Sequence, residues 1–329
     1  MFTITKKQEL FCPFQPSISP YVQSVENHTL QWCETFQLYP GAMFNELKAS
    51  NFGYMTCRFY PTASHERLCI TNDLLVLLFL LDDLFDHQDA VAQDPAALKM
   101  LMKNFLGVLT EDKRFTMENG GNVLAALSDV WQRMKACSSA AFQREFVQDI
   151  LLLFNAIEWQ NKNANSWKTP SISEYIERRP IIGGAHIAGR LIYFAEDITL
   201  PASVKDHPTL QRLNDLCGHL GCWANDLFSL SKEIAHGDTH NLVMVIQQEK
   251  HLELDDAIHE TVLLHNEEMR EFYEHYNSLE DFPAGARKYA YDLAMILRGN
   301  MDWSFEDTAR YEFNCVEHYT ITDRLTETV

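Results

Sequence analysis

The stretch LLVLLFLLDDLFDHQD, residues 74–89, carries the clearest structural signal in this sequence. Its first eight residues are apolar, and neither proline nor glycine occurs between Pro61 and Pro95. Leucines recur there at helical spacing, which predicts one long buried helix that ends near His87. An apolar run of this length is far too short to span a bilayer. The stretch therefore indicates a helix in the core of an all-α protein.

The acidic residues at the end of this stretch form the first candidate metal site. Asp82 and Asp86 share one helix face about 6 Å apart, with Asp83 beside them. Two carboxylates at that spacing can jointly bind Mg2+ when substrate phosphates complete its shell. Acids at a helix C-terminus oppose the helix dipole, so the cluster is costly without a cation. An ordinary polar helix end is the alternative, and the apolar residues before it favour the metal.

A second polar stripe lies in CWANDLFSLSKE, residues 222–233. Asn225, Ser229 and Glu233 follow one another at helical spacing, so their oxygens lie along one stripe of a helix. An amide, a hydroxyl and a carboxylate suit a cation that arrives with its phosphates. Lys232 is adjacent and can reach a diphosphate as a point charge. The alternative is the polar face of a surface helix, which the apolar flanks of the stretch disfavour.

The rest of the chain also predicts helices and few strands. Prolines break up the first forty residues, so we expect an irregular arm with one helix, Tyr21–Leu38. The pair Asn119-Gly120 is expected in a loop between helices. No linker, repeat or charge block divides the chain, which predicts a single domain over residues 1–329. Further helices are predicted at Ala96–Leu109, Asn122–Trp159, Ser171–Glu177, Pro208–Ala235, Leu242–Gln248, Asp255–Leu279, Pro283–Arg298 and Trp303–Tyr311.

Composition excludes several classes of partner. The formal net charge is −19 and no basic stripe occurs, which argues against nucleic acid and against anionic lipid surfaces. The eight cysteines form no CxxC pair, so neither a disulfide framework nor a zinc site is indicated. Scattered single cysteines and the lack of an apolar secretory signal predict a cytoplasmic protein. An acidic chain can still bind a diphosphate, because metal cations reverse the local field.

Taken together, the two polar stripes resemble the DDxxD and NDxxSxxxE metal motifs of bacterial-type class I terpene synthases. DDLFD is followed about 140 residues later by NDLFSLSKE, and the pair is far more specific than either half. HGDTHNLV (236–243) resembles the loop after the second motif, and GNMDWSFEDTARY (299–311) resembles the segment with the closing Arg-Tyr pair. CPFQPSISP (12–20) and RFYPTAS (58–64) resemble the N-terminal arm and a helix junction of that family. The resemblance covers essentially the whole chain.

The resemblance implies roles for named residues. The family's diphosphate-sensing arginine precedes the motif asparagine by 46 residues, which points to Arg179 (225 − 46), with its neighbour Arg178 leaving the register open. Gly183 matches the family's effector position at a helix break, and Pro180 and Gly183-Gly184 independently predict an interrupted helix. The implied diphosphate donors are Arg179, Lys232, Arg310 and Tyr311. The implied ligands of three Mg2+ ions are Asp82, Asp83, Asp86, Asn225, Ser229 and Glu233.

The resemblance also implies a fold and a reaction. We expect a single-domain class I terpenoid synthase bundle around a central apolar pocket, with the arm 1–20 as a candidate cap. The enzyme would be a carbon–oxygen lyase that ionises a linear prenyl diphosphate, cyclises the carbocation and releases diphosphate. Farnesyl diphosphate, giving a sesquiterpene, is the first choice of substrate, and geranylgeranyl diphosphate, giving a diterpene, is the second. Members of this family are often dimers, so the resemblance allows a homodimer.

The carbocation would need apolar walls with aromatic faces, because the ring quadrupole attracts positive charge. Phe79, one turn before Asp82, and Trp303, just ahead of the Arg-Tyr pair, are the first choices. Weaker choices, for which core packing is the simpler interpretation, are Tyr60, Phe154 and Trp223.

Two rival functions remain. A prenyl-chain elongating synthase would carry a second aspartate-rich motif in place of Asn225, Ser229 and Glu233. A non-enzymatic helical binding protein explains the helices and the acidity but gives no reason for two metal stripes. The sequence does not decide which product is formed.

Overall fold

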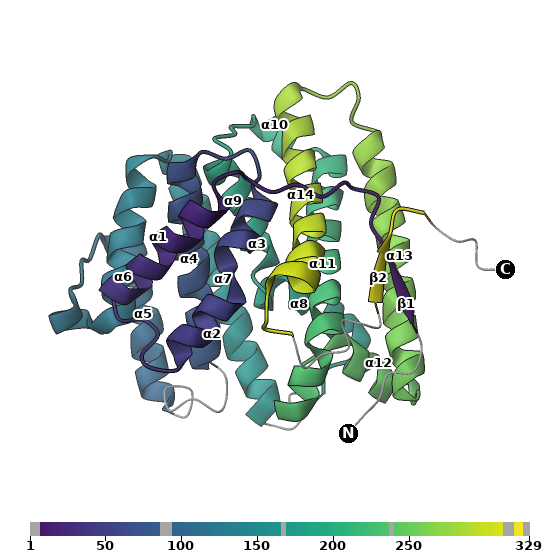
Figure 1. The fold of residues 1–329 in the computed structure, drawn as a ribbon, viewed down its shortest axis with the longest axis horizontal. Coiled ribbons are helices and arrows are strands. Elements are labelled where there is room, and N and C mark those ends of the chain that lie inside the picture. The colour runs from purple at the N-terminus through teal and green to yellow at the C-terminus, as the bar shows by residue number, and fades with distance from the viewer. Residues whose placement is uncertain (1–6, 86–93, 166–168, 237–239, 312–318, 325–329) are drawn as a thin grey trace.

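Helices form most of the regular structure of the computed structural model, which describes residues 7–85, 94–165, 169–236, 240–311 and 319–324 (Figure 1). The all-α fold that the sequence predicts is confirmed. The helices are α1 (Val22–Thr35), α2 (Met43–Ser50), α3 (Phe52–Phe59), α4 (His65–Phe85), α5 (Pro95–Glu111), α6 (Met117–Ala136), α7 (Ala140–Asn165), α8 (Ile172–Ile182), α9 (Ala185–Ala195), α10 (Ala202–Lys205), α11 (Pro208–His236), α12 (Leu242–Lys250), α13 (Leu254–Asn277) and α14 (Ala284–Asp302), followed by η1 (Trp303–Asp307), a π-helical turn. The strands are β1 (Gln8–Phe11) and β2 (Tyr319–Thr322).

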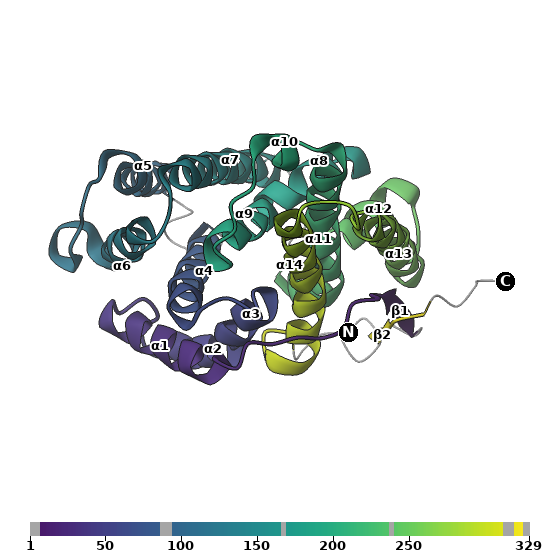
Figure 2. The same cartoon turned by 90° about the horizontal axis from the view of Figure 1, so that it is seen from above.

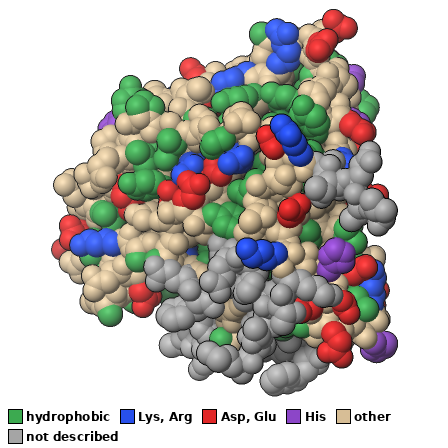
Figure 3. All heavy atoms as spheres, turned by 45° about the vertical axis from the view of Figure 1, so that its right-hand side comes forward, with side chains coloured by type: hydrophobic (Ala, Val, Ile, Leu, Met, Phe, Trp, Pro, Cys, Tyr) green, Lys and Arg blue, Asp and Glu red, His purple; other side chains and the backbone are tan. Residues whose placement is uncertain are grey.

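The helices pack in layers around a central space. Seen from above, α1, α2 and α3 lie along one side of the molecule and α5, α7 and α8 along the other, with α4, α9 and α14 between them (Figure 2). Buried apolar side chains from all these regions join into one continuous cluster. Within the described residues, no helix is long and apolar enough to cross a membrane. On the face drawn in Figure 3, acidic and basic side chains are interspersed among apolar ones.

The long helix predicted from residues 74–89 is α4. Leu74, Val76 and Leu77 are almost completely buried, as the apolar run requires. The helix is described up to Phe85, so the predicted ligand Asp86 lies outside the described residues. Asp82 and Asp83 occupy its last described turn, at the end that the sequence places beside a cation.

The predicted helix break between α8 and α9 is present, although α8 is longer than the sequence suggests. It continues past Glu177 and through Pro180, and ends at Gly183. Gly184 has φ +66°, a left-handed conformation that a residue with a side chain rarely adopts, and α9 starts after it. Pro180 lies inside α8, and its ring packs closely on Gly218 of α11, where an added Cβ would lie 3.2 Å from Pro180 Cβ. The glycines therefore make the break, and the proline does not.

Three other predicted boundaries are wrong. The predicted helix Asn122–Trp159 is two helices, α6 and α7, separated at Cys137 and capped anew by Ser139, whose Oγ accepts from the Phe142 amide at 3.2 Å. The break expected at Asn119-Gly120 is present as a kink within α6, where Gly121 with φ +75° separates a short first turn from the rest of the helix, so only the length of the expected loop is wrong. The predicted helix Trp303–Tyr311 is the π-helical turn η1, after which Arg310 and Tyr311 lie in a turn.

The arm at the N-terminus pairs with the other end of the chain. β1 and β2 form a parallel pair in which Gln8 lies opposite Tyr319 and Phe11 opposite Thr322. The pair sits on α13 (Figure 1), where the Asn266 side chain accepts from the Phe11 amide and donates to the Glu9 carbonyl, both at 2.8 Å. Residues 7–20 contribute nothing to the lining of the central pocket.

Candidate active site

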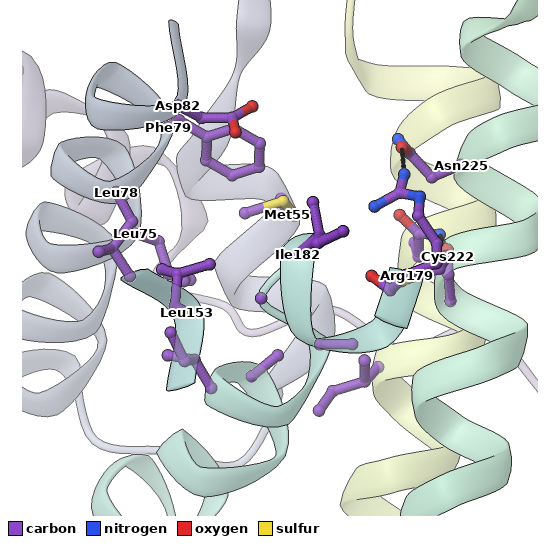
Figure 4. Close-up of a pocket in the computed structure, with 18 of the residues that line it drawn as sticks. Met55, Leu75, Leu78, Phe79, Asp82, Leu153, Arg179, Ile182, Cys222 and Asn225 are labelled. Carbon is purple, nitrogen blue, oxygen red and sulfur yellow. Dashed lines mark hydrogen bonds between the residues drawn. The ribbon is translucent and has the colours of Figure 1, made fainter. Parts of the chain in front are cut away.

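A cavity of about 310 Å3 lies between α3, α4, α7, α8, α9, α11 and α14. Most of its wall is apolar, with Leu75, Leu78 and Leu153 among the side chains that face it (Figure 4). Asp82 and Asn225 stand on opposite walls of the same pocket, with Phe79 next to Asp82. The cavity therefore combines an apolar interior with polar groups that come from both sequence motifs.

Asp82 is the polar group of the α4 wall. Its side chain is accessible from the cavity, yet protein surrounds it, and this burial together with the charge of Asp83 raises its pKa to about 6. Arg179, Arg310 and Lys232 partly offset the rise by their positive charge. A carboxyl group with a raised pKa next to a second carboxyl group gains most from a bound cation. The electrostatics of this wall thus suit a metal.

The three residues of the α11 stripe lie together as their spacing predicts. The Ser229 hydroxyl lies 2.7 Å from a Glu233 carboxylate oxygen and 2.8 Å from the Asn225 carbonyl oxygen. Asn241, at the start of α12, donates to the other Glu233 oxygen at 2.7 Å. Burial and the charge of Asp226 raise the pKa of Glu233 to about 7, although both hydrogen bonds act against the rise. This carboxyl group, like Asp82, is held where a cation would stabilise its charged form.

Arg179 reaches the pocket, and Arg178 does not. The Arg179 guanidinium lines the cavity and donates from Nη2 to Asn225 Oδ1 at 2.9 Å. The Arg178 guanidinium instead lies over the ring of Trp159, 4.9 Å from its centroid. Of the two arginines, only Arg179 lines the cavity, so Arg179 stays the predicted diphosphate donor.

Asp226 holds the Arg179 guanidinium in place, and the sequence pattern did not identify it as a site residue. Its buried carboxylate accepts from Arg179 Nε at 2.9 Å, from the Tyr175 hydroxyl at 2.7 Å and from the Leu242 amide at 3.0 Å. A signal existed in the sequence, because an acid flanked at helical spacing by Trp223 and other apolar residues falls on a buried face. A charge there requires a buried partner.

Gly183 makes room for that arginine. A Cβ at this position would lie 2.3 Å from Arg179 Nη1 and 2.9 Å from Cys222 Sγ. Contacts this short do not occur between real side chains, so only glycine allows the guanidinium its observed place. The helix break therefore serves the arginine as well as the chain path.

The closing pair Arg310-Tyr311 lies at the same polar region. The Tyr311 hydroxyl accepts from Asn225 Nδ2 at 2.8 Å, and Arg310 Nη2 lies 3.8 Å from Asp83 Oδ1. The Arg310 guanidinium also stands 5.5 Å from the ring of Phe79, which lines the cavity. The C-terminal segment thus touches both metal motifs.

The other aromatic residues divide into two groups. Trp303 and Phe154 line the cavity, and the Trp303 indole is fixed by donating to the Ser50 carbonyl at 3.0 Å. Tyr60 and Trp223 are buried outside the lining, as core residues.

The residues of the two motifs fit a divalent cation by their chemistry. The described ligands are carboxylate, amide and hydroxyl oxygens, which Mg2+ prefers. No three His, Cys, Asp or Glu side chains converge within the described ranges, since Asp86 falls outside them and the α11 stripe has only one carboxylate. The two pocket carboxyl groups with raised pKa, Asp82 and Glu233, are the groups whose charge a cation would stabilise.

Comparison with known proteins agrees with this geometry. Residues 73–271 match the family described as terpene synthase family 2, C-terminal metal binding. The (+)-T-muurolol synthase of Roseiflexus castenholzii is 30% identical over 92% of this chain and 93% of its own length. The (+)-eremophilene synthase of Sorangium cellulosum is 28% identical over 89% of each chain. The crystal structure of linalool/nerolidol synthase from Streptomyces clavuligerus superimposes with a TM-score of 0.79 at 20% identity, covering 89% of this chain and 99% of that one.

The family match spans α4 to α13 and so contains both motif-bearing helices, Arg179 and the helix break. The sequence identity extends over nearly the full length of the relatives, and the likeness to the solved structure independently supports the fold. The chain therefore belongs to terpene synthase family 2 and is a class I terpene synthase, a lyase that acts on a prenyl diphosphate and binds a divalent metal.

Proposed function

We propose that this enzyme converts farnesyl diphosphate to a sesquiterpene with the help of three Mg2+ ions. The observation that carries the proposal is the meeting of Asp82, Arg179 and the α11 stripe at one apolar cavity. The names of the relatives add support, since the T-muurolol synthase is described as cyclising (2E,6E)-farnesyl diphosphate. Geranylgeranyl diphosphate is not favoured by any observation on this chain.

The polar residues would hold and ionise the diphosphate end of the substrate. Bound Mg2+ supplies positive charge that stabilises the diphosphate as it leaves. The proposed ligands are Asp82, Asp83, Asp86, Asn225, Ser229 and Glu233. The proposed hydrogen-bond donors to the diphosphate are Arg179, Lys232, Arg310 and Tyr311.

The apolar walls would control the carbocation that remains. They exclude water, which would otherwise quench the cation before it cyclises. Phe79 and Trp303 present aromatic rings to the cavity, and such faces stabilise positive charge. The backbone at Gly183, which caps the end of α8, would also stabilise the carbocation. A helix terminus leaves carbonyl oxygens without helical donors, and these oxygens attract positive charge.

We also propose that residues 1–329 form one domain and that the enzyme works in the cytoplasm. The continuous apolar cluster supports the first statement, and the unpaired thiols of the described cysteines support the second. A homodimer stays a prediction.

The experiment compares geranyl, farnesyl and geranylgeranyl diphosphate as substrates of the purified enzyme. Diphosphate release is measured with Mg2+ present, and the hexane extract is identified by mass spectrometry. We expect release from farnesyl diphosphate with cyclic C15 products. A protein that binds all three and releases diphosphate from none would contradict the proposal, and C20 products alone would replace it by a diterpene synthase.

A further inference from the structure

An ion cluster lies outside the pocket, between α3 and the end of α14, and it is buried apart from Glu306, whose side chain is 63% exposed. The side chain of Arg58 is only 9% exposed, and its three nitrogens all donate to carboxylates. Nη1 donates to Asp302 at 3.1 Å, Nη2 to Glu306 at 3.0 Å and Nε to Asp307 at 2.5 Å. One guanidinium thus holds three acids that lie within six consecutive residues.

Asp302 directly precedes the π-helical turn η1, and Glu306 and Asp307 are its last two residues. Such a turn is rare in proteins and occurs frequently at functional positions. Arg298 donates to Asp302 at 2.7 Å, so the cluster contains two cations and three carboxylates. Asp302 and Asp307 are largely buried, with side chains 1% and 10% exposed. Without Arg58 the carboxylates would repel one another in a poorly hydrated place, and the turn would move toward water.

Hydrogen bonds to backbone carbonyls attach the same turn to the junction of α2 and α3. Asn51 Nδ2 donates to the Asp307 carbonyl at 2.6 Å, and the Ala309 amide donates to the Ala49 carbonyl at 2.9 Å. Trp303, the first residue of the turn, donates from its indole to Ser50. The turn is therefore held from one side by Arg58 and from the other by the α2–α3 junction.

The segment held in this way leads directly to the pocket. Trp303 and Tyr311 line the cavity, and Arg310 reaches Asp83. Arg310 and Tyr311 follow Asp307 by only three and four residues. So few residues cannot absorb a displaced turn without moving both side chains, because each residue spans at most about 3.5 Å.

From this geometry we propose that Arg58 is a positioning residue for the clamp formed by Arg310 and Tyr311. Its guanidinium sets the path of residues 302–307, so that the clamp side chains reach the polar end of the pocket. The planar fork is needed, because an ammonium at this place can approach three carboxylates only as one point charge. The inference rests on the proposed function in one respect, that the clamp engages the diphosphate.

A double-mutant cycle tests the inference. Arg58→Lys is made in the wild type and in the Arg310→Ala variant, and kcat and the share of acyclic or hydroxylated products are measured for all four proteins. We expect Arg58→Lys to lower kcat at least about tenfold in the wild type and to raise the acyclic share. In the Arg310→Ala background it should lower kcat less than about twofold, because the clamp it positions is already lost.

One control variant and one replacement variant keep the test decisive. Arg212 forms an equally bidentate pair with Glu271, at 2.6 and 2.7 Å, away from the pocket lining, so Arg212→Lys should leave rate and products unchanged. If Arg58→Lys does not fold, Asp307→Asn replaces it in the cycle, since it removes one charge of the cluster and keeps the shape.

The outcomes separate the inference from the proposed function. Equal losses from Arg58→Lys in both backgrounds would overturn the positioning role, as would wild-type rate and products for Arg58→Lys alone. Wild-type behaviour of Arg310→Ala by itself would instead overturn the proposed clamp.

Discussion

At the scale of single residues, Arg179 shows how the pocket keeps a positive charge in a buried place. Burial alone would lower the pKa of Arg179, but the charge of Asp226 outweighs burial and raises the pKa well above its ordinary value. The guanidinium therefore stays charged while it donates to Asn225. An arginine kept charged in this way is ready to donate to a diphosphate, once Mg2+ takes the Asn225 oxygen that Arg179 now contacts.

Arg310→Ala should lower the turnover rate, and Arg310→Lys should not restore it. A guanidinium engages two phosphate oxygens with a planar fork, whereas an ammonium offers a single point charge. Closure excludes water and completes the pull on the diphosphate, so the lysine variant should turn over at least about tenfold more slowly and form more acyclic alcohol. Turnover rate and product ratio are measured together. Wild-type values of both for the lysine variant would remove Arg310 from the site.

Asn225→Ala and Glu233→Ala should each abolish turnover and leave the helical fold intact. Both residues belong to the stripe proposed to hold Mg2+. Burial raises the pKa of Glu233, so removing this carboxyl group also removes the free-energy cost of burying its charge. The far-ultraviolet helical signal and the melting temperature should therefore change little. A variant that unfolds while its folded fraction remains fully active would assign a structural role to the residue.

At the scale of secondary structure, the sequence predicts well those helices whose formation depends mainly on the pattern of their own residues. α4 and α11 each carry an apolar face and a polar stripe, and both helices occupy the predicted ranges as far as the structure describes them, up to Phe85 and His236. The two helices therefore place most of the candidate site from local pattern alone. Asp226 was missed because its role depends on Arg179, a partner from another helix.

Elements that depend on distant partners were missed. α3 is short, and its Gly53 is explained only by α1, because a Cβ there would lie 2.6 Å from Glu26 Oε2. The π-helical turn depends on Arg58, far away in the sequence. β1 and β2 each have four residues and pair only with each other, so no alternating pattern of useful length exists.

Gly183→Ala should lower kcat by at least about tenfold with little loss of stability. Gly183 has φ −75°, which alanine adopts freely, so the backbone is not strained. The added methyl group would displace the Arg179 guanidinium, from which it would lie only 2.3 Å away. Gly189→Ala is the matched control, since a Cβ there meets its nearest atom at 3.6 Å. Full activity of the Gly183 variant would show that Arg179 has another path into the pocket.

Asp292→Asn should stabilise the protein by an amount that grows with pH. Burial raises the pKa of Asp292 in α14 to about 7, against the hydrogen bond and charge of Lys288. The folded chain thus holds a proton that the unfolded chain loses above about pH 4, so this contribution to stability is lost as pH rises toward 7. Asparagine does not titrate, and the difference in unfolding free energy should grow by about 3 kcal/mol between pH 5 and pH 8, because about two pH units of the shift lie in that interval. Denaturant titrations at pH 5 and pH 8 measure it, and a difference that stays constant would contradict the assignment.

At the scale of the whole molecule, a strongly acidic chain places three cations at the polar end of one cavity. The net charge is −19, yet Arg179, Arg310 and Lys232 all act on Asp82. A free diphosphate is repelled by the surface as a whole, whereas a diphosphate accompanied by divalent cations is not. The charge distribution thus favours arrival of substrate and metal together.

Removal of metal should therefore abolish activity. Chelator is expected to stop diphosphate release, and added Mg2+ to restore it. Zn2+ should restore it poorly, because the proposed ligands are all oxygens and zinc favours nitrogen and sulfur. Rates are measured in metal-free buffer with each ion added back, and full activity in metal-free buffer would contradict the mechanism.

The parallel pairing of β1 with β2 has a consequence for the order in which the molecule folds. Thr320 and Gln8, which share a hydrogen bond in this pair, are 312 positions apart in the chain. Closing so long a loop costs more chain entropy than any local helix, and two four-residue strands return little for it. The pair should therefore form after the helices and open before they do. The joining of the two ends of the chain is therefore the last step expected in folding, after the helices that carry the pocket have packed.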